Sequence, residues 1–189
     1  MPSTRRRRRP LVVAAAVVVV LLAGCGAQNV EADARERALE GLETTVVDVL
    51  GCVAAAVPRI EPARGVETLS ADLGDCAYTD VLNADTDAIL SDQVVLPAGG
   101  GTVAFSGATT GDDLELRLVT QATGVAQAGV ASARSSPATC WQLTADLATD
   151  IVQDYSGTQC HEAVMTRMNP TERVPFEDLD ASDAPLPPG

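Results

Sequence analysis

The chain lacks lysine altogether, has a single histidine and carries few aromatic side chains. All 13 of its basic residues are arginine, and phenylalanine, tryptophan and tyrosine together make up 3% of the 189 residues. Without lysine there is no Schiff-base residue, no lysine general base and no phosphate-binding lysine of a P-loop. With so few aromatic rings, the core must be built mainly from valine, leucine and alanine.

Motifs that mark common enzyme classes are also missing. Neither the dinucleotide-binding pattern G-x-G-x-x-G nor the nucleophile pattern G-x-S-x-G occurs in the sequence. The single histidine, His161, would need an activated serine to act as the base of a hydrolytic triad, and no residue pattern marks one. We therefore predict a protein that is not an enzyme and that holds no cofactor.

The excess of acidic over basic residues argues against one class of partner, the nucleic acids. The formal charge of the chain is −13, but five of the arginines, Arg5–Arg9, lie in the first 24 residues, which contain no acidic residue. Residues 25–189 therefore carry 8 arginines against 26 acidic residues, a formal charge of −18. Such a surface repels the phosphates of nucleic acids, so we predict no nucleic-acid partner. It also repels anionic lipid headgroups, so any membrane attachment must come from another feature.

The N-terminus has the order of an export signal. Arg5–Arg9 precede 13 apolar residues, Leu11–Ala23, which are followed by Gly24 and Cys25. A helix of 13 residues spans about 20 Å, whereas the hydrocarbon core of a bilayer is about 30 Å thick. The run therefore favours a transient signal over a stable membrane-spanning helix. Because arginine clusters stay on the cytoplasmic side, Cys25 is expected to emerge on the outer side.

The run ends in Leu22-Ala23-Gly24-Cys25, which resembles the lipobox of bacterial lipoproteins. The resemblance implies that residues 1–24 are a signal peptide removed by signal peptidase II, and that the Cys25 sulfur carries a diacylglyceryl group. It also implies acylation of the new N-terminus, so that two or three acyl chains anchor the protein firmly at about 0.8 kcal/mol per buried CH₂. The implied location is extracytoplasmic, with the protein lipid-anchored to the cell membrane.

Four cysteines remain once Cys25 is assigned to lipid: Cys52, Cys76, Cys140 and Cys160. An even number in an oxidising compartment predicts two disulfides, for which three connectivities exist. Proximity in the sequence favours Cys52–Cys76 and Cys140–Cys160, each worth about 3 kcal/mol by the chain-entropy relation. A zinc site is disfavoured, because the spacing is not C-x₂-C and only one histidine is present.

The rest of the chain divides into a tether at 25–30, a globular domain at 31–169 and an acidic, proline-rich tail at 170–189 that we predict to be disordered. Apolar residues three and four apart predict an amphipathic helix over 31–57, which ends at Pro58. Alternating apolar and polar residues over 102–120 predict a β-hairpin with one buried and one solvent-exposed face. The sequence thus predicts an α+β fold, in which the N-terminal amphipathic helix packs on a small antiparallel β-sheet.

Other segments give weaker patterns. We expect a helical turn at 66–73 and strands at 89–96, 124–134 and 139–143. Residues 144–155 fit either a helix or the second half of a hairpin, and the hairpin is slightly favoured because it would bring Cys140 and Cys160 together. The strand-rich C-terminal half resembles other small uncharacterised lipoproteins of high-GC Gram-positive bacteria, but no motif in it transfers a function.

Three sets of residues are candidates for ligand binding. His161, Met165 and Met168 would share one face of a helix and offer imidazole and thioether ligands suited to copper(I), although buried packing is the commoner role of such methionines. Asn83, Asp85 and Asp87 alternate like the start of a calcium loop but lack its glycine and final glutamate. Trp141 is expected to pack on the disulfide of its neighbour Cys140 rather than to stack on a sugar.

The leading functional prediction is a non-enzymatic binding or interaction module whose ligand or protein partner the sequence does not identify. Two alternatives are a copper-handling lipoprotein that uses His161, Met165 and Met168, and a purely structural component of the cell envelope.

Overall fold

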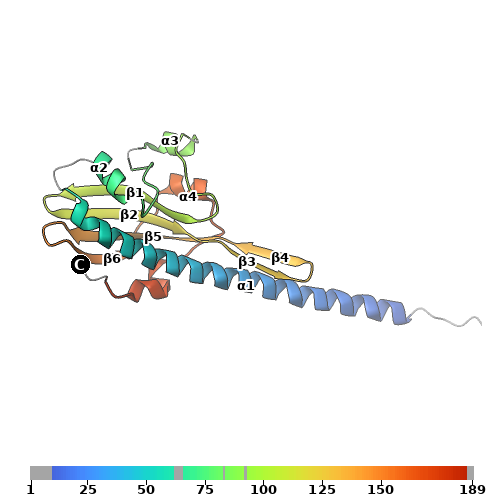
Figure 1. Ribbon diagram of the computed structural model, residues 1–189. Helices are drawn as coiled ribbons and strands as arrows, with labels where there is room; N and C mark the ends of the chain where they lie inside the picture. Colours follow the sequence, from blue (N-terminus) through green and yellow to red (C-terminus); the bar gives the residue numbers. More distant parts are fainter. Residues whose placement is uncertain (1–9, 62–65, 83, 92, 187–189) are drawn as a thin grey trace, which may run out of the picture.

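The computed structural model describes residues 10–61, 66–82, 84–91 and 93–186, and of residues 10–28, 66 and 67 only the backbone. The described residues form an α+β domain in which one long N-terminal helix lies across an antiparallel sheet (Figure 1). The predicted fold class is confirmed.

Helix α1 (Pro10–Ala56) continues into the short 3₁₀ helix η1 (Val57–Arg59), where Pro58 lies in the first turn. The helix predicted over 31–57 lies within α1 except for Val57, which begins η1. Residues 25–30, predicted as a tether, belong to the same unbroken helix. Its buried residues recur every three or four positions and define the face that meets the rest of the domain: Val30, Ala34, Ala38, Leu42, Val46, Val49, Leu50 and Val53.

The main sheet has the order β1-β2-β5-β6, with all neighbours antiparallel. Its strands are β1 (Gly101–Thr110), β2 (Asp113–Gln121), β5 (Pro137–Asp146) and β6 (Ile151–Gly157), and the short β7 (Glu172–Arg173) pairs in parallel with β5. The hairpin predicted over 102–120 is confirmed as β1–β2. Residues 144–155 belong to the β5–β6 hairpin, so the slightly favoured alternative is the correct one.

Two of the weaker predictions need correction. Residues 124–134 form not one strand but a hairpin, β3 (Gly124–Ala128) and β4 (Ala131–Ser135), because Gly129, with φ of 63°, allows a tight turn between them. The strand predicted at 89–96 is wrong. The chain instead forms α3 (Thr86–Leu90), whose N-terminus is capped by the Asp85 carboxylate, which accepts a hydrogen bond from the Ala88 amide at 2.7 Å. The helical turn predicted at 66–73 is α2 (Val66–Leu73).

The sheet is covered on both faces. One face packs against α1 and forms the first core, with Leu114, Leu116, Leu118, Trp141 and Leu143 at its centre. The opposite face packs against α3 and α4 (Glu162–Met168) and forms the second core, which includes Val103, Val119 and Cys140. The alternation of side chains along a strand produces this division, since Cys140 and Trp141 are neighbours in β5 and point to opposite faces.

The C-terminal segment is ordered as far as the structure describes it, which corrects the prediction of a disordered tail. It forms β7 and two short 3₁₀ helices, η2 (Phe176–Asp178) and η3 (Asp180–Asp183). Phe176, Leu179 and Ala181 are buried in the first core. The Phe176 ring stacks on Trp141 at a centroid distance of 5.9 Å, so the tail supplies one of the few aromatic groups of the core.

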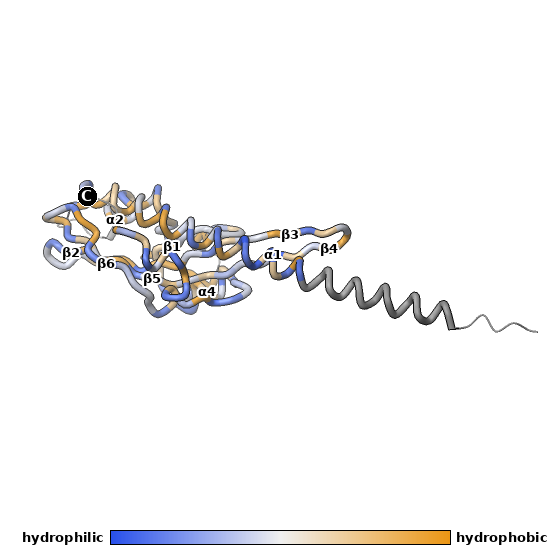
Figure 2. The backbone as a smooth tube through the Cα atoms, turned by 90° about the horizontal axis from the view of Figure 1, so that it is seen from below, coloured by the Kyte–Doolittle hydropathy of each residue, from blue (hydrophilic) through white to orange (hydrophobic). Residues whose placement is uncertain are grey.

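The β3–β4 hairpin lies along α1 and projects beyond the main sheet, toward the N-terminal part of the helix (Figures 1 and 2). The two elements approach closely at Gly124, where a Cβ atom would lie 2.2 Å from the Ala34 carbonyl oxygen and 2.5 Å from the Ala38 nitrogen. Small residues on both sides continue this contact, with Val30, Ala34 and Ala126 buried together. The absence of a side chain at residue 124 therefore sets the distance between hairpin and helix.

A Gly124→Ala substitution should force the hairpin away from α1, because the added methyl group collides with backbone atoms that cannot rotate aside. We expect a loss of stability of about 1–3 kcal/mol, as for other overpacked sites, measured by denaturant unfolding. Gly51→Ala is the matched control, since its Cβ would meet nothing within 4 Å and alanine favours a helix. If the two variants were equally stable, the close packing of the hairpin would be refuted.

Candidate functional site

The candidate anchor residue, Cys25, lies on α1, and its side chain is outside the described part of the structure. The helix runs unbroken from Pro10 through Cys25 into the domain, and Val30 is its first residue seen packed against the rest of the protein. Five helical residues advance by about 8 Å. A group attached to Cys25 would therefore be held close to the folded domain rather than at the end of a long flexible linker.

The four other cysteines form the two disulfides predicted from sequence proximity. Cys52–Cys76, with a Cα–Cα distance of 5.5 Å, joins the end of α1 to the segment after α2. Cys140–Cys160, with a Cα–Cα distance of 5.3 Å, joins β5 to the segment before α4. An apolar N-terminal helix together with two disulfides is compatible with an extracytoplasmic or membrane-associated protein. Among the described residues, 29–59 are long and apolar enough to cross a membrane, but their apolar face is largely used by the first core.

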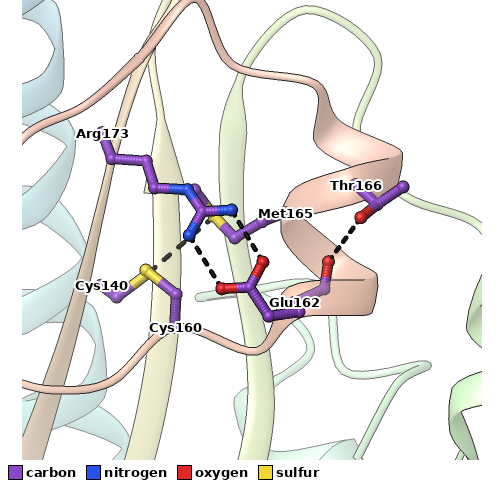
Figure 3. A network of polar contacts seen from close by, with 6 residues as sticks. All are labelled: Cys140, Cys160, Glu162, Met165, Thr166 and Arg173. Atoms are coloured by element: carbon purple, nitrogen blue, oxygen red, sulfur yellow. Dashed lines mark hydrogen bonds and ion pairs between the residues drawn. A yellow bond between two sulfur atoms is a disulfide. The ribbon is translucent and has the colours of Figure 1, made fainter.

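The copper candidates lie on α4 or directly before it, and Figure 3 shows one of them, Met165, beside the Cys140–Cys160 disulfide. His161 precedes the helix, and its ring lies 5.8 Å from that of Phe105, with a buried Nδ1 that has no hydrogen-bond partner. Met165 is only 2% exposed, and its sulfur lies 3.9 Å from the Cys140 sulfur. The two sulfur atoms are in van der Waals contact, because Cys140 in its disulfide has no proton to donate. Met168 is also buried in the second core.

The sulfur atoms of α4 are thus packing groups in the arrangement seen here. Within the described ranges, no three histidine, cysteine, aspartate or glutamate side chains gather as a metal site would require. A copper ion bound by both thioethers would have to draw Met165 out of the second core and away from the disulfide. This packing favours the structural role of the methionines over the ligand role.

A copper(I) titration should therefore give the same weak affinity for the natural protein and for a Met168→Leu variant. Leucine fills the same buried space without offering a thioether, so only a true ligand role would be sensitive to the change. A competition assay with a coloured copper(I) chelator measures the difference. Clearly tighter binding by the natural protein would contradict the packing role and support the copper-handling alternative.

An exposed ion pair joins α4 to β7 in the same region. The Arg173 guanidinium donates two parallel hydrogen bonds, each 2.8 Å long, to the two carboxylate oxygens of Glu162 (Figure 3). These hydrogen bonds lower the pKa of Glu162 and raise that of Arg173. The pair lies next to a hollow of about 330 Å³ lined by the Cys140–Cys160 disulfide and Phe176, but both charged groups are engaged with each other.

The lowered pKa of Glu162 predicts a pH-dependent contribution to stability. Because the folded pKa lies below the unfolded one, the ionised pair stabilises the fold above the ordinary pKa range of glutamate, and this gain is lost as the pH falls through the folded pKa. Glu162→Gln should lower the melting temperature slightly at neutral pH and converge with the natural protein in acid. Glu36→Gln, on the exposed side of α1, is the control, and a constant difference for Glu162→Gln at every pH would contradict the prediction.

The other candidate residues have structural roles where the structure describes them. Asp85 caps α3, Asp87 lies in the first turn of that helix, and Asn83 falls outside the described residues. Trp141 is fully buried in the first core, where its Nε1 donates to the Thr120 hydroxyl at 2.9 Å. It does not pack on the disulfide of its neighbour Cys140, because that disulfide lies on the other face of the sheet. The sequence pattern could have shown this, since adjacent strand residues alternate.

Shallow hollows line the surface. One, of about 400 Å³, lies beside Cys76 and is bordered by Asp75, Tyr78 and Thr102, with Tyr78 45% exposed. The pKa values of Asp146 and Glu162 are both lowered by hydrogen bonds. The hydrogen bonds on Asp146 belong to a turn, and those on Glu162 belong to its ion pair with Arg173.

Comparisons of the chain with protein-family models, with curated proteins and with solved structures find no match.

Proposed function

We propose that the protein is a non-enzymatic interaction module displayed outside the cytoplasmic membrane and anchored there by lipid on Cys25. The observation that carries the proposal is the continuity of α1. The N-terminal half of this helix contains the apolar run and the lipobox-like Leu22-Ala23-Gly24-Cys25. Its C-terminal half contributes buried side chains to the first core. The proposed anchor residue and the helix that packs in the first core therefore belong to one continuous helix.

The chemistry of the domain supports this location. Two disulfides persist in oxidising compartments and are rare in the cytoplasm. The strong negative charge keeps an exported domain soluble and leaves attachment to the acyl chains rather than to the protein surface as a whole. An interaction role is favoured over catalysis because the lowered pKa values of Asp146 and Glu162 are explained by hydrogen bonds of a turn and of an ion pair.

Protease accessibility tests the location. A short epitope tag placed after Gly189 should be digested when proteinase K is added to intact spheroplasts, because the domain lies on the outer side. A cytoplasmic protein in the same sample must remain intact and serves as the control. Protection of the tag until the membrane is lysed would refute an extracytoplasmic domain.

A further inference from the structure

Acidic residues are distributed very unevenly over this protein. The chain contains 26 of them, yet residues 116–145 contain none. The β3–β4 hairpin lies in the middle of this acid-free stretch, and Arg134 is its one charged residue. The turns at the opposite end of the main sheet, by contrast, contain Asp112, Asp113, Asp146 and Asp150. The domain thus has an acidic end at these turns. At the other end the hairpin itself carries only Arg134, while Glu31 and Arg35 of α1 lie beside it.

The acid-free hairpin points toward the anchor. Gly124 lies against Ala34 and Ala38 of α1, and β3 runs from there toward the N-terminal part of the helix (Figure 1). Its five residues to the turn advance about 16 Å at 3.3 Å per residue, a length that corresponds to about 11 residues of helix. The contact lies at Ala34 and Ala38, and the turn of the hairpin lies about 11 helical residues closer to the N-terminus of α1. The turn is therefore at the level of Cys25.

The turn itself exposes an apolar side chain without cover. Val130 is fully exposed, at 107% of the reference area, and follows Gly129 at the tip. Val125, nearer the base of the hairpin, is 49% exposed. On α1 beside the hairpin, Glu31, Asp33 and Glu36 are exposed together with Arg35 and Arg37, and Arg35 pairs with Glu172. An exposed valine at the tip of a hairpin without acidic residues is suited to an apolar surface at the level of the anchor.

We propose that the tip of the β3–β4 hairpin is a second membrane contact, in which Val130 enters the boundary between lipid headgroups and acyl chains beside the lipid on Cys25. This inference rests on the proposed function, since it needs the chain to be held at the membrane through the start of α1. Burial of Val130 is favourable, and the hairpin itself contains no carboxylate that anionic headgroups would repel.

A two-point attachment has a consequence for orientation. A lipid on Cys25 alone would leave the domain able to tilt about one point, whereas a hairpin in contact beside it restricts the tilt. The close packing of Gly124 against α1 makes helix and hairpin one unit, so both contacts act on the whole domain. The acidic end with Asp113 and Asp146 is then held away from the membrane and presented to the exterior.

Depth-dependent quenching of tryptophan emission tests the contact. The full-length gene is expressed with Val130→Trp, and the lipid-anchored protein is reconstituted into vesicles of phosphatidylcholine and phosphatidylglycerol that contain brominated acyl chains. Ile151→Trp is the matched control, because Ile151 is also an exposed apolar residue but lies at the acidic end of the sheet. The natural Trp141 is fully buried and gives a constant background.

The expected result is a blue shift and loss of the added emission for Val130→Trp, with no change for Ile151→Trp or the natural protein. Unquenched emission of Val130→Trp in protein that floats with the vesicles would overturn the hairpin contact while leaving the anchor intact. Protein that does not float with the vesicles at all would instead refute the proposed anchor, so the two failures are distinguishable.

Discussion

Replacing Cys25 with alanine is expected to abolish incorporation of labelled palmitate and to remove the band of mature size. Only a thiol at residue 25 can form the thioether to diacylglycerol, and cleavage before this residue depends on that modification in the lipoproteins that the segment resembles. The variant should therefore keep residues 1–24 or be cleaved elsewhere. Metabolic labelling followed by electrophoresis and membrane fractionation measures both effects.

The remaining cysteines offer a matched control for this experiment. A double variant, Cys52→Ala with Cys76→Ala, removes two sulfur atoms that form a disulfide with each other. It should incorporate palmitate as the natural protein does, because neither cysteine is the proposed site of lipid attachment. A Cys25→Ala protein that remains membrane-bound at the mature size would show that the anchor lies elsewhere.

Substitution of Phe176 by alanine should destabilise the domain by about 3–5 kcal/mol, the usual cost of removing a buried phenylalanine side chain. Phe176 is 2% exposed and lies between two other rings, stacked on Trp141 at 5.9 Å and edge-on to Tyr155 at 5.9 Å. Denaturant unfolding followed by Trp141 fluorescence measures the loss.

Asp178→Ala is the control for the same segment, since Asp178 is exposed in the same 3₁₀ helix and should be close to neutral. Equal stability of Phe176→Ala and Asp178→Ala would mean that the C-terminal segment does not belong to the core. The earlier expectation of a disordered tail would then be right.

The elements that could be predicted from the sequence are those with a strong hydrophobic period. The helical spacing that includes Leu42, Val46 and Val53 identified the part of α1 that packs on the sheet, and the alternation of Leu114, Leu116 and Leu118 identified β2. The disulfide pairing followed from proximity, because short loops cost the least entropy to close. In these cases the local pattern and the tertiary packing agree.

The features that were missed have weak or misleading local patterns. The β3–β4 hairpin consists largely of alanine, glycine and serine, so polar and apolar residues alternate little, and its turn depends on the conformation of Gly129. The C-terminal segment has the proline and aspartate content of a disordered chain, and only Phe176, Leu179 and Ala181 attach it to the core. These three buried residues pack on parts of the chain that are distant in the sequence. They therefore produce no periodic pattern by which the sequence could predict them.

The spacing of His161, Met165 and Met168 correctly placed the two methionines on one helix but could not show which way that helix faces. The structure turns Met165 toward the Cys140–Cys160 disulfide. A spacing of four and seven residues is shared by a metal site and by a packed helix face, so the direction of burial decides between them.

Intact-mass analysis of the protein extracted from membranes under non-reducing conditions tests the central claim most directly. The account predicts a chain that begins at Cys25, carries the mass of a diacylglyceryl group with or without a further acyl chain, and is lighter by the four hydrogens of two disulfides. A chain that begins at Met1, or that starts beyond residue 25 without lipid, would contradict it.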